Sequence, residues 1–352
     1  MQRPNAVVRT TVLLALAGLS CGRAPGADAP LPAAGPAEPR ALLSALAADS
    51  MEGRATATAG SARAARLIAG RMQAIGLEPA GDSGYFQRVP LALTRRPDGT
   101  RDLRLLGPGY ADSAPTGQPV LDVNVIGLLR GADSAVGEEA VVVGAHFDHL
   151  GIGAPVAGDS IYNGADDDAS GVVAVLGAAQ ALAGGPPTRR TVVFLITTGE
   201  EQGLLGTRWY TDHPAVPLER TVADLQVEMI GRPDSLVGGP GRAWLTGYER
   251  STMGRQLAAA GIPVVGDPRP EFDFFLRSDN IAFARRGIPA HTLSSYNLHT
   301  DYHQPSDEVE RVDFDHLGRL LDATARAVRV LADGEAPRWN PGGRPQPSGA
   351  GS

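Results

Sequence analysis

Short apolar runs alternate along the chain with longer segments in which apolar residues recur at helical spacing. The short runs are rich in β-branched residues and predict strands at residues 123–129, 141–143, 192–196, 225–230 and 288–293. The helical spacing predicts helices within residues 39–76, after residue 170, within 201–213, at 280–286 and at 314–331. Strands that alternate with helices predict an α/β fold, with a mostly parallel central sheet flanked by helices on both faces.

The pattern predicts one catalytic domain over residues 39–334, because no linker-like stretch divides its strands and helices. The pattern of residues 85–130 predicts short strands and turns, with the strand at 123–129 among them. Residues 232–277 contain many Gly and Pro residues, and their pattern predicts no clear element. Residues 335–352 are rich in Pro and Gly and predict a disordered tail.

The N-terminus has the features of an export signal over residues 1–21. A basic start precedes a short apolar run that is too short to span a membrane, and the run ends beside Cys21, the only cysteine. A lone cysteine there resembles a bacterial lipoprotein processing site, so lipidation of Cys21 is expected; ordinary secretion is the alternative. Residues 22–38 predict a flexible tether. The protein is therefore expected to be exported, either to the periplasm or cell envelope as a lipoprotein or, otherwise, as a secreted protein.

Composition limits the class of partner. Of the 352 residues, 43% are apolar, which is enough for a large core, and the net charge of −7 disfavours nucleic acids and anionic membranes as partners. Contact with a membrane is expected only through a lipid anchor.

Three polar fragments follow or precede the apolar runs in the middle of the chain. They carry His146, Asp166 to Asp168, and the pair Glu200 and Glu201. Five acidic groups near apolar segments, with no basic residue among them, would be costly to bury, and a divalent cation removes that cost. Histidine together with carboxylates is a ligand set that suits zinc. The alternative, solvated loop acids and a core histidine, suits any one fragment alone but not all three together.

Two later fragments add candidates to this set. Glu228 stands at the end of an apolar run, where a lone acid is unusual in a core. Tyr302 and His303 precede the last helix, where they can approach the same sheet edge. Among the other histidines, His149 is interpreted as supporting the site or facing solvent, and His299 as a possible residue of the cleft mouth.

Taken in order, the motifs resemble those of a known family. Gly-Ala-His-Phe-Asp-His, Gly-Ala-Asp-Asp-Asp-Ala-Ser-Gly, Gly-Glu-Glu-Gln-Gly-Leu-Leu-Gly, Glu-Met-Ile-Gly-Arg and Asp-Tyr-His-Gln-Pro-Ser-Asp all occur between residues 40 and 332. Together they resemble the exopeptidases that use two adjacent zinc ions, metallopeptidase family twenty-eight, which contains bacterial leucyl aminopeptidases and glutamate carboxypeptidase.

The resemblance implies two Zn²⁺ ions per chain and a set of five ligands. Asp167 would bridge the two ions, Glu201 and His303 would complete one site, and His146 with Glu228 would complete the other. Many relatives carry Asp where this chain has Glu228, and the longer side chain shifts the expected position of the ion.

The resemblance also implies roles beside the metals. Glu200 would be the general base that takes a proton from a metal-bridged water, and Tyr302 would donate a hydrogen bond to the developing oxyanion. Asp148 would hydrogen-bond the far nitrogen of His146 and fix its tautomer. Asp168 would support the site, and the peptide bond before it is often cis in this family.

The function that follows is removal of N-terminal residues from peptide substrates with a free N-terminus. A glutaminyl-peptide cyclase with one zinc, or a receptor-like protein that binds without catalysis, are the alternatives on the same fold. The full ligand set argues against both. The preferred side chain, and the choice between aminopeptidase, dipeptidase and carboxypeptidase, stay open.

Overall fold

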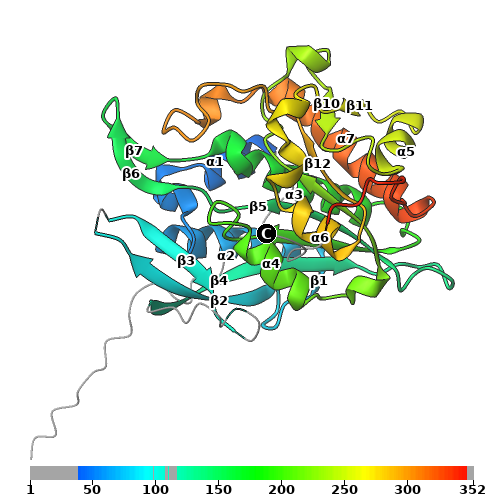
Figure 1. The fold of residues 1–352 in the computed structure, drawn as a ribbon, viewed down its shortest axis with the longest axis horizontal. Helices are drawn as coiled ribbons and strands as arrows, with labels where there is room; N and C mark the ends of the chain where they lie inside the picture. Colours follow the sequence, from blue (N-terminus) through cyan, green and yellow to red (C-terminus); the bar gives the residue numbers. More distant parts are fainter. Residues whose placement is uncertain (1–38, 98, 108–109, 111–116, 347–352) are drawn as a thin grey trace, which may run out of the picture. The chain divides into compact units, whose positions relative to one another are not determined.

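The computed structural model describes residues 39–97, 99–107, 110 and 117–346 (Figure 1). The predicted export signal, Cys21, the tether and residues 347–352 lie outside the described residues. Within the described residues, no helix is both long and apolar enough to cross a membrane.

The helices and strands follow the predicted alternation. The helices are α1 (Pro39–Leu46), α2 (Ala59–Ile75), α3 (Gly171–Ala183), α4 (Leu205–Asp212), α5 (Met253–Ala259), α6 (Asn280–Arg286) and α7 (Phe314–Asp333). The strands are β1 (Glu78–Pro79), β2 (Phe86–Arg95), β3 (Arg101–Leu105), β4 (Gln118–Leu129), β5 (Ala140–His146), β6 (Gly151–Val156), β7 (Asp159–Tyr162), β8 (Thr191–Thr197), β9 (Thr221–Val227), β10 (Ala243–Leu245), β11 (Val264–Gly266) and β12 (Ala290–Ser294).

One large sheet forms the centre of the domain. Its strand order is β11-β10-β12-β9-β5-β8-β4-β2-β3, with β1 beside β4, and β6 with β7 forms a separate hairpin. The four central strands β12, β9, β5 and β8 are parallel, whereas β4, β2 and β3 on one side are antiparallel to their neighbours. The predicted α/β fold class is confirmed, with antiparallel strands at the margins of the sheet.

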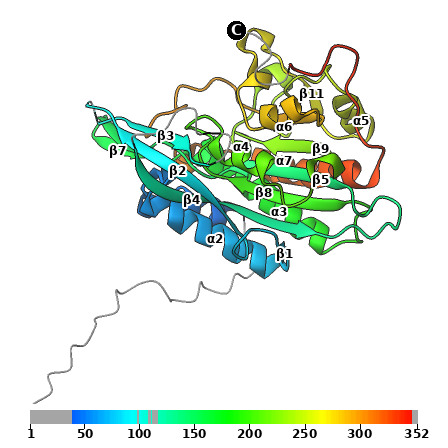
Figure 2. The ribbon, with the colours of Figure 1, turned by 60° about the horizontal axis from the view of Figure 1, so that its bottom comes forward.

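Helices cover both faces of this sheet, because the central strands are apolar on both sides. β5 and β8 are buried along their whole length. The larger core lies under α1, α2, α3 and α7, and a second core lies under α4 and α6 on the opposite face. Figure 2 shows α4 and α6 on one side of the sheet and α2 and α3 on the other.

Local sequence signals set the ends of the longer helices. The Thr58 hydroxyl accepts a hydrogen bond from the Ser61 amide at the start of α2, and Gly76 ends that helix with a φ of 86°. Asp313 caps α7 by accepting from the amides of Asp315 and His316. The segment 232–277, which predicted no clear element, contains β10, α5 and β11 joined by irregular turns.

The C-terminal segment differs from the expected disordered tail. Residues 335–346 pack against the domain: the indole N–H of Trp339 donates to the Gly287 carbonyl at 2.8 Å, and Trp339 forms an isolated bridge with Ser251. The Asn340 side chain adds hydrogen bonds to the carbonyls of Glu249 and Ser251. The contacts of Trp339 therefore hold in place a segment whose Pro- and Gly-rich composition predicted disorder.

Candidate metal centre and active site

The predicted site residues converge at one edge of the sheet. His146 is the last residue of β5, Glu228 follows β9 directly, and Glu200 and Glu201 follow β8 after a short turn. These three strands are parallel and adjacent, so their carboxyl ends meet at the same edge. Asp167 reaches that edge from the short helical segment between β7 and α3.

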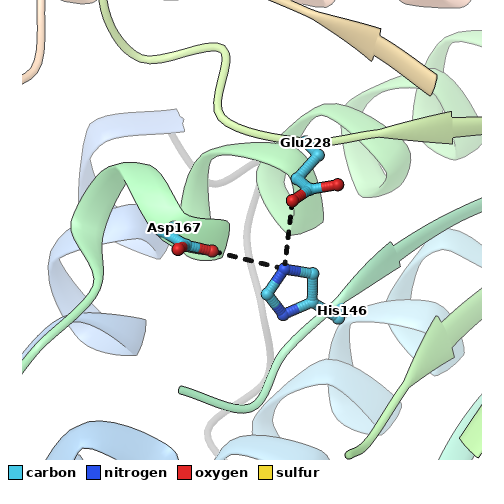
Figure 3. A group of neighbouring side chains, drawn as sticks. All are labelled: His146, Asp167 and Glu228. Atoms are coloured by element: carbon cyan, nitrogen blue, oxygen red, sulfur yellow. Dashed lines mark ion pairs between the residues drawn. The ribbon is translucent and has the colours of Figure 1, made fainter. Parts of the chain in front are cut away.

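A first group of possible metal ligands consists of His146, Asp167 and Glu228 (Figure 3). The Nε2 atom of His146 lies 3.3 Å from Asp167 Oδ1 and 4.0 Å from Glu228 Oε1. Neither His146 Nε2 nor Asp167 Oδ1 has a hydrogen-bond partner among the described residues, although both atoms are buried. Burial raises the pKa of Glu228 to about 7, against the opposing effect of His146.

A second group shares Asp167 through its other oxygen. His303 Nε2 lies 3.3 Å from Asp167 Oδ2 and 3.2 Å from Glu201 Oε2. Ligands held about 2.0 Å from a tetrahedral zinc ion are separated by roughly 3.3 Å from one another, so these spacings suit zinc. Burial lowers the pKa of His303, but the carboxylates of Asp167 and Glu201 outweigh it and raise the pKa to about 10. The donor types and spacings therefore fit zinc, and Asp167 belongs to both groups.

His149 is a residue of the site whose role the sequence left undecided. Its side chain is fully buried, and its Nδ1 atom lies 2.8 Å from Glu201 Oε1. It also belongs, with Asp167 and Glu201, to a possible metal-ligand group. His149 approaches Oε1 of Glu201 and His303 approaches Oε2, so the two histidines contact both oxygens of this carboxylate and orient it.

The supporting contacts of His146 differ in detail from the expected ones. Its Nδ1–H donates to the main-chain carbonyl of Asp148 at 3.1 Å, while the Asp148 carboxylate lies 3.8 Å away. That carboxylate instead accepts from the Glu200 amide at 3.1 Å and from the Thr56 hydroxyl at 3.0 Å. Asp148 thus fixes the tautomer of His146 through its backbone and fixes the main chain at Glu200 through its side chain.

Glu200 has the surroundings of a base. Its carboxylate makes no hydrogen bond or ion pair within the part of the chain that the structure describes, and it lines the same cavity as Glu201 and Glu228. Burial raises its pKa well above the usual value, with further repulsion from Glu228 and Glu201 and an opposing effect of His146.

Buried carboxylates hold the loop that carries Asp167. Asp307 accepts the amides of Asp166 and Asp167 at 3.0 Å each, and Asp168 accepts the amides of Gly171 and Met229 at 3.0 Å each. The peptide bond between Asp167 and Asp168 is cis. Asp168 therefore links this loop to the residue that follows Glu228.

His299 makes a second connection to the same loop. Its Nε2 atom lies 3.0 Å from Asp166 Oδ2 and its side chain is nearly buried. His299 thus connects the segment that carries Tyr302 and His303 to the aspartate loop. The sequence had suggested a position at the mouth of the cleft instead.

Arg54 is a site-supporting residue that the sequence did not reveal. It is completely buried, and its guanidinium donates to the carbonyl oxygens of Leu46, Phe147, Asn163 and Gly164 at 2.6–2.9 Å. Phe147 lies between two site residues, and Gly164 begins the aspartate loop. A single cation therefore fixes two ligand-bearing loops to α1.

Tyr302 faces the metal groups. Its ring stacks on His303 with centroids 3.8 Å apart. Burial, together with the charges of Asp167 and Glu201, raises the pKa of Tyr302, so its hydroxyl stays protonated and can donate.

Comparisons with known proteins agree with this arrangement. A model described as peptidase family M28 matches residues 124–328. Vacuolar membrane proteases of Verticillium alfalfae and Talaromyces marneffei are 25% and 28% identical over 56% and 62% of this chain, which covers only 18% and 22% of those proteins. The chain therefore spans about a fifth of the length of these curated relatives.

Solved structures share the fold at low identity. A zinc aminopeptidase from Bacillus subtilis superposes with a TM-score of 0.58 at 15% identity, over 84% of this chain and 95% of that one. A glutaminyl cyclase from Porphyromonas gingivalis superposes with a TM-score of 0.54 at 16% identity, over 82% and 96%. These likenesses establish the fold and do not separate the two activities.

Proposed function

The chain belongs to peptidase family M28, and from this premise we propose that it is a zinc-dependent aminopeptidase that removes N-terminal residues from peptides. One observation carries the proposal. Two groups of possible zinc ligands share Asp167, and Glu200, a carboxylate that neither group uses, lines the same cavity. A free carboxylate beside a complete ligand set is what hydrolysis by an activated water requires.

Zinc would be held by the two groups already described. His146, Asp167 and Glu228 would hold one ion, and Asp167, Glu201 and His303 the other. Zinc supplies Lewis acidity, which lowers the pKa of water and polarises a carbonyl oxygen.

The chain's own residues would handle the proton and the developing charge. Glu200 would accept the proton of the attacking water and deliver it to the leaving amine, and the hydrogen bond from its amide to Asp148 keeps it in place. The Tyr302 hydroxyl would donate to the oxygen that becomes negative during attack. The acidic lining of the cavity would favour a substrate with a positively charged N-terminus.

A glutaminyl cyclase of the same fold is the second candidate, because such an enzyme is among the structural matches. A cyclase with one zinc needs only one ligand group, whereas both groups here are complete, which favours hydrolysis. A receptor-like protein without catalysis would need neither Glu200 nor the ligands, and the chain retains them all.

The test combines metal analysis with two assays on the purified protein. Zinc per chain is counted after removal of loosely bound metal, and activity is measured on aminoacyl p-nitroanilides and on a glutaminyl peptide. About two zinc ions with release of nitroaniline supports the proposal; one ion with cyclisation supports the cyclase. No metal and no turnover would reject both enzymes. A panel of free-amine and N-blocked peptides then separates an aminopeptidase from an endo- or carboxypeptidase.

A further inference from the structure

A cavity of about 230 Å³ opens beside the metal groups and extends away from them. Beside the metal groups, this cavity is lined by residues of the irregular segment 232–277, of β12 and of the segment after β12. Those that matter for recognition are Trp244, Thr246, Phe274, Arg277, Ser294 and Tyr296. This part of the cavity is the place where the structure can hold a substrate group other than the scissile bond.

Aromatic rings form one wall. Phe274 lies between Trp244 and Tyr296, with ring centroids 5.4 and 6.0 Å away. The Trp244 indole nitrogen is buried and has no hydrogen-bond partner in the described part of the chain. A wall of this kind accepts the flat or apolar part of a ligand.

Arg277 is the only arginine or lysine that lines the cavity, among residues that the structure describes, and His303 belongs to a metal group. It is exposed, and its guanidinium carbon lies 5.1 Å above the Phe274 ring centroid. Burial raises the pKa of Tyr296 to about 12, and the positive charge of Arg277 opposes this rise. The charge of Arg277 therefore acts inside the cavity.

Two arginines in the neighbouring segments, unlike Arg277, have carboxylate partners. Arg232 pairs with Asp301 at 2.6 Å, and Arg269 pairs with Asp234 at 2.6 Å. The main-chain N–H of Arg277 donates to the Phe274 carbonyl, but the Arg277 guanidinium has no hydrogen bond or ion pair within residues 39–97, 99–107, 110 and 117–346. Of these three arginines, Arg277 is thus the one whose positive charge is not paired with a carboxylate of the described residues.

We propose that Arg277 binds a carboxylate carried by the substrate, an inference that rests on the proposed peptidase function. The planar guanidinium can donate two parallel hydrogen bonds to a carboxylate, and Phe274 beneath it restricts its orientation. Two substrate groups have this chemistry: the acidic side chain of an N-terminal Glu or Asp, and the C-terminus of a dipeptide. Either group is repelled by the acids of the metal groups, and Arg277 offers it a charge of opposite sign.

The experiment measures kcat/KM for two matched substrate pairs with the full, zinc-loaded protein. The first pair is Glu-p-nitroanilide against Gln-p-nitroanilide, and the second is leucylglycine against leucylglycinamide. Within each pair the two substrates differ only in whether the relevant group is a carboxylate or an amide. Arg277→Met should reduce the acid-to-amide ratio of at least one pair by roughly tenfold or more, because a charge-assisted hydrogen bond is lost. Arg277→Lys should lose less, since charge remains without the planar fork.

The pair that responds identifies the source of the carboxylate: the anilide pair indicates an acidic N-terminal side chain, and the dipeptide pair a C-terminus. Arg285→Met, which removes the same charge from α6 outside this cavity, should leave both ratios unchanged. If Arg277→Met changes kcat/KM equally for the acid and the amide in both pairs, the inference is overturned and the proposed function still stands. Failure of the wild-type protein to hydrolyse any of the four substrates would overturn both.

Discussion

Replacing Arg54 by methionine should cost a large part of the stability of the domain. The substitution keeps a flexible side chain of similar length but removes every donor from a completely buried position. Four carbonyl oxygens that now accept from the guanidinium would lose that hydrogen bond. Because these carbonyls belong to α1 and to two ligand-bearing loops, the loss also reaches the metal centre.

The magnitude follows from two opposing terms. The Gly164 carbonyl keeps its hydrogen bond from the Ala169 amide, so three acceptors are left unsatisfied. At roughly 1–3 kcal/mol for each buried acceptor, they cost about 6 kcal/mol at the middle of that range. Burial lowers the pKa of Arg54 from 12.5 to about 10. A depression of that size corresponds to about 3 kcal/mol of net cost for the buried charge, which methionine does not incur. The expected loss is therefore about 3 kcal/mol, a large part of the stability of a marginal domain.

Urea unfolding in the presence of a chelator measures this loss without the added stability of bound zinc. Arg88→Met is the control: Arg88 is exposed on β2 and pairs only with Asp82 at 3.4 Å, so it should change stability by less than about 0.5 kcal/mol. Arg54→Lys, whose single ammonium cannot reach four carbonyls, should lie between Arg54→Met and the wild type. A loss below about 1 kcal/mol for Arg54→Met would refute the reasoning, and so would a lysine variant as stable as the wild type.

Four further outcomes are expected. Glu200→Gln should lower kcat by about 10²–10⁴-fold and keep a zinc content near two per chain, whereas Glu201→Gln should lose zinc. Metal analysis and kinetics of both variants in one buffer test this. Loss of zinc in Glu200→Gln and retention in Glu201→Gln would contradict the assigned roles. Glu228→Asp should retain two zinc ions and Glu228→Ala should lose one, and full metal content in the alanine variant would exclude Glu228 as a ligand. His149→Ala should weaken the binding of one zinc by roughly 10–100-fold in a chelator competition, because Glu201 loses the contact that orients it, and unchanged affinity would remove His149 from that role. Burial lowers the pKa of His291 from 6.5 to about 4, so its contribution to stability is complete above pH 6.5 and about 3 kcal/mol is lost as pH falls toward 4. Urea unfolding in the presence of a chelator at pH 7 and pH 4.5 measures this. Between these pH values the wild type should lose about 3 kcal/mol more free energy of unfolding than His291→Gln, and equal losses would contradict the prediction.

Much of the fold could be predicted because the strands that carry the site are continuous apolar runs. Valine-rich segments such as 141–143 leave no other interpretation, and acidic residues directly behind them mark the carboxyl ends of parallel strands. The convergence of His146, Asp167 and Glu228 followed from that logic together with the family resemblance.

The remaining features depend on contacts between residues far apart in the chain. His149 meets Glu201 across 52 positions, and no local pattern signals that hydrogen bond. A completely buried arginine such as Arg54 contradicts the usual distribution of charged residues, and its partners are carbonyl groups, which every residue has. The wall of the cavity lies in turns rich in Gly and Pro, where periodicity gives no information about which side chains face each other.

The packing of the C-terminal segment has a practical consequence for protein production. Trp339 lies in contact with the rings of Phe275 and His291, with centroids 6.5 and 5.8 Å away, and Phe275 stands next to a residue of the aromatic wall. Composition alone would suggest a recombinant protein that ends at residue 334. Such a protein would lack Trp339 and would expose the rings of Phe275 and His291 to solvent. Such a product would be prone to aggregate during purification, so affinity tags and terminal cuts belong after residue 346.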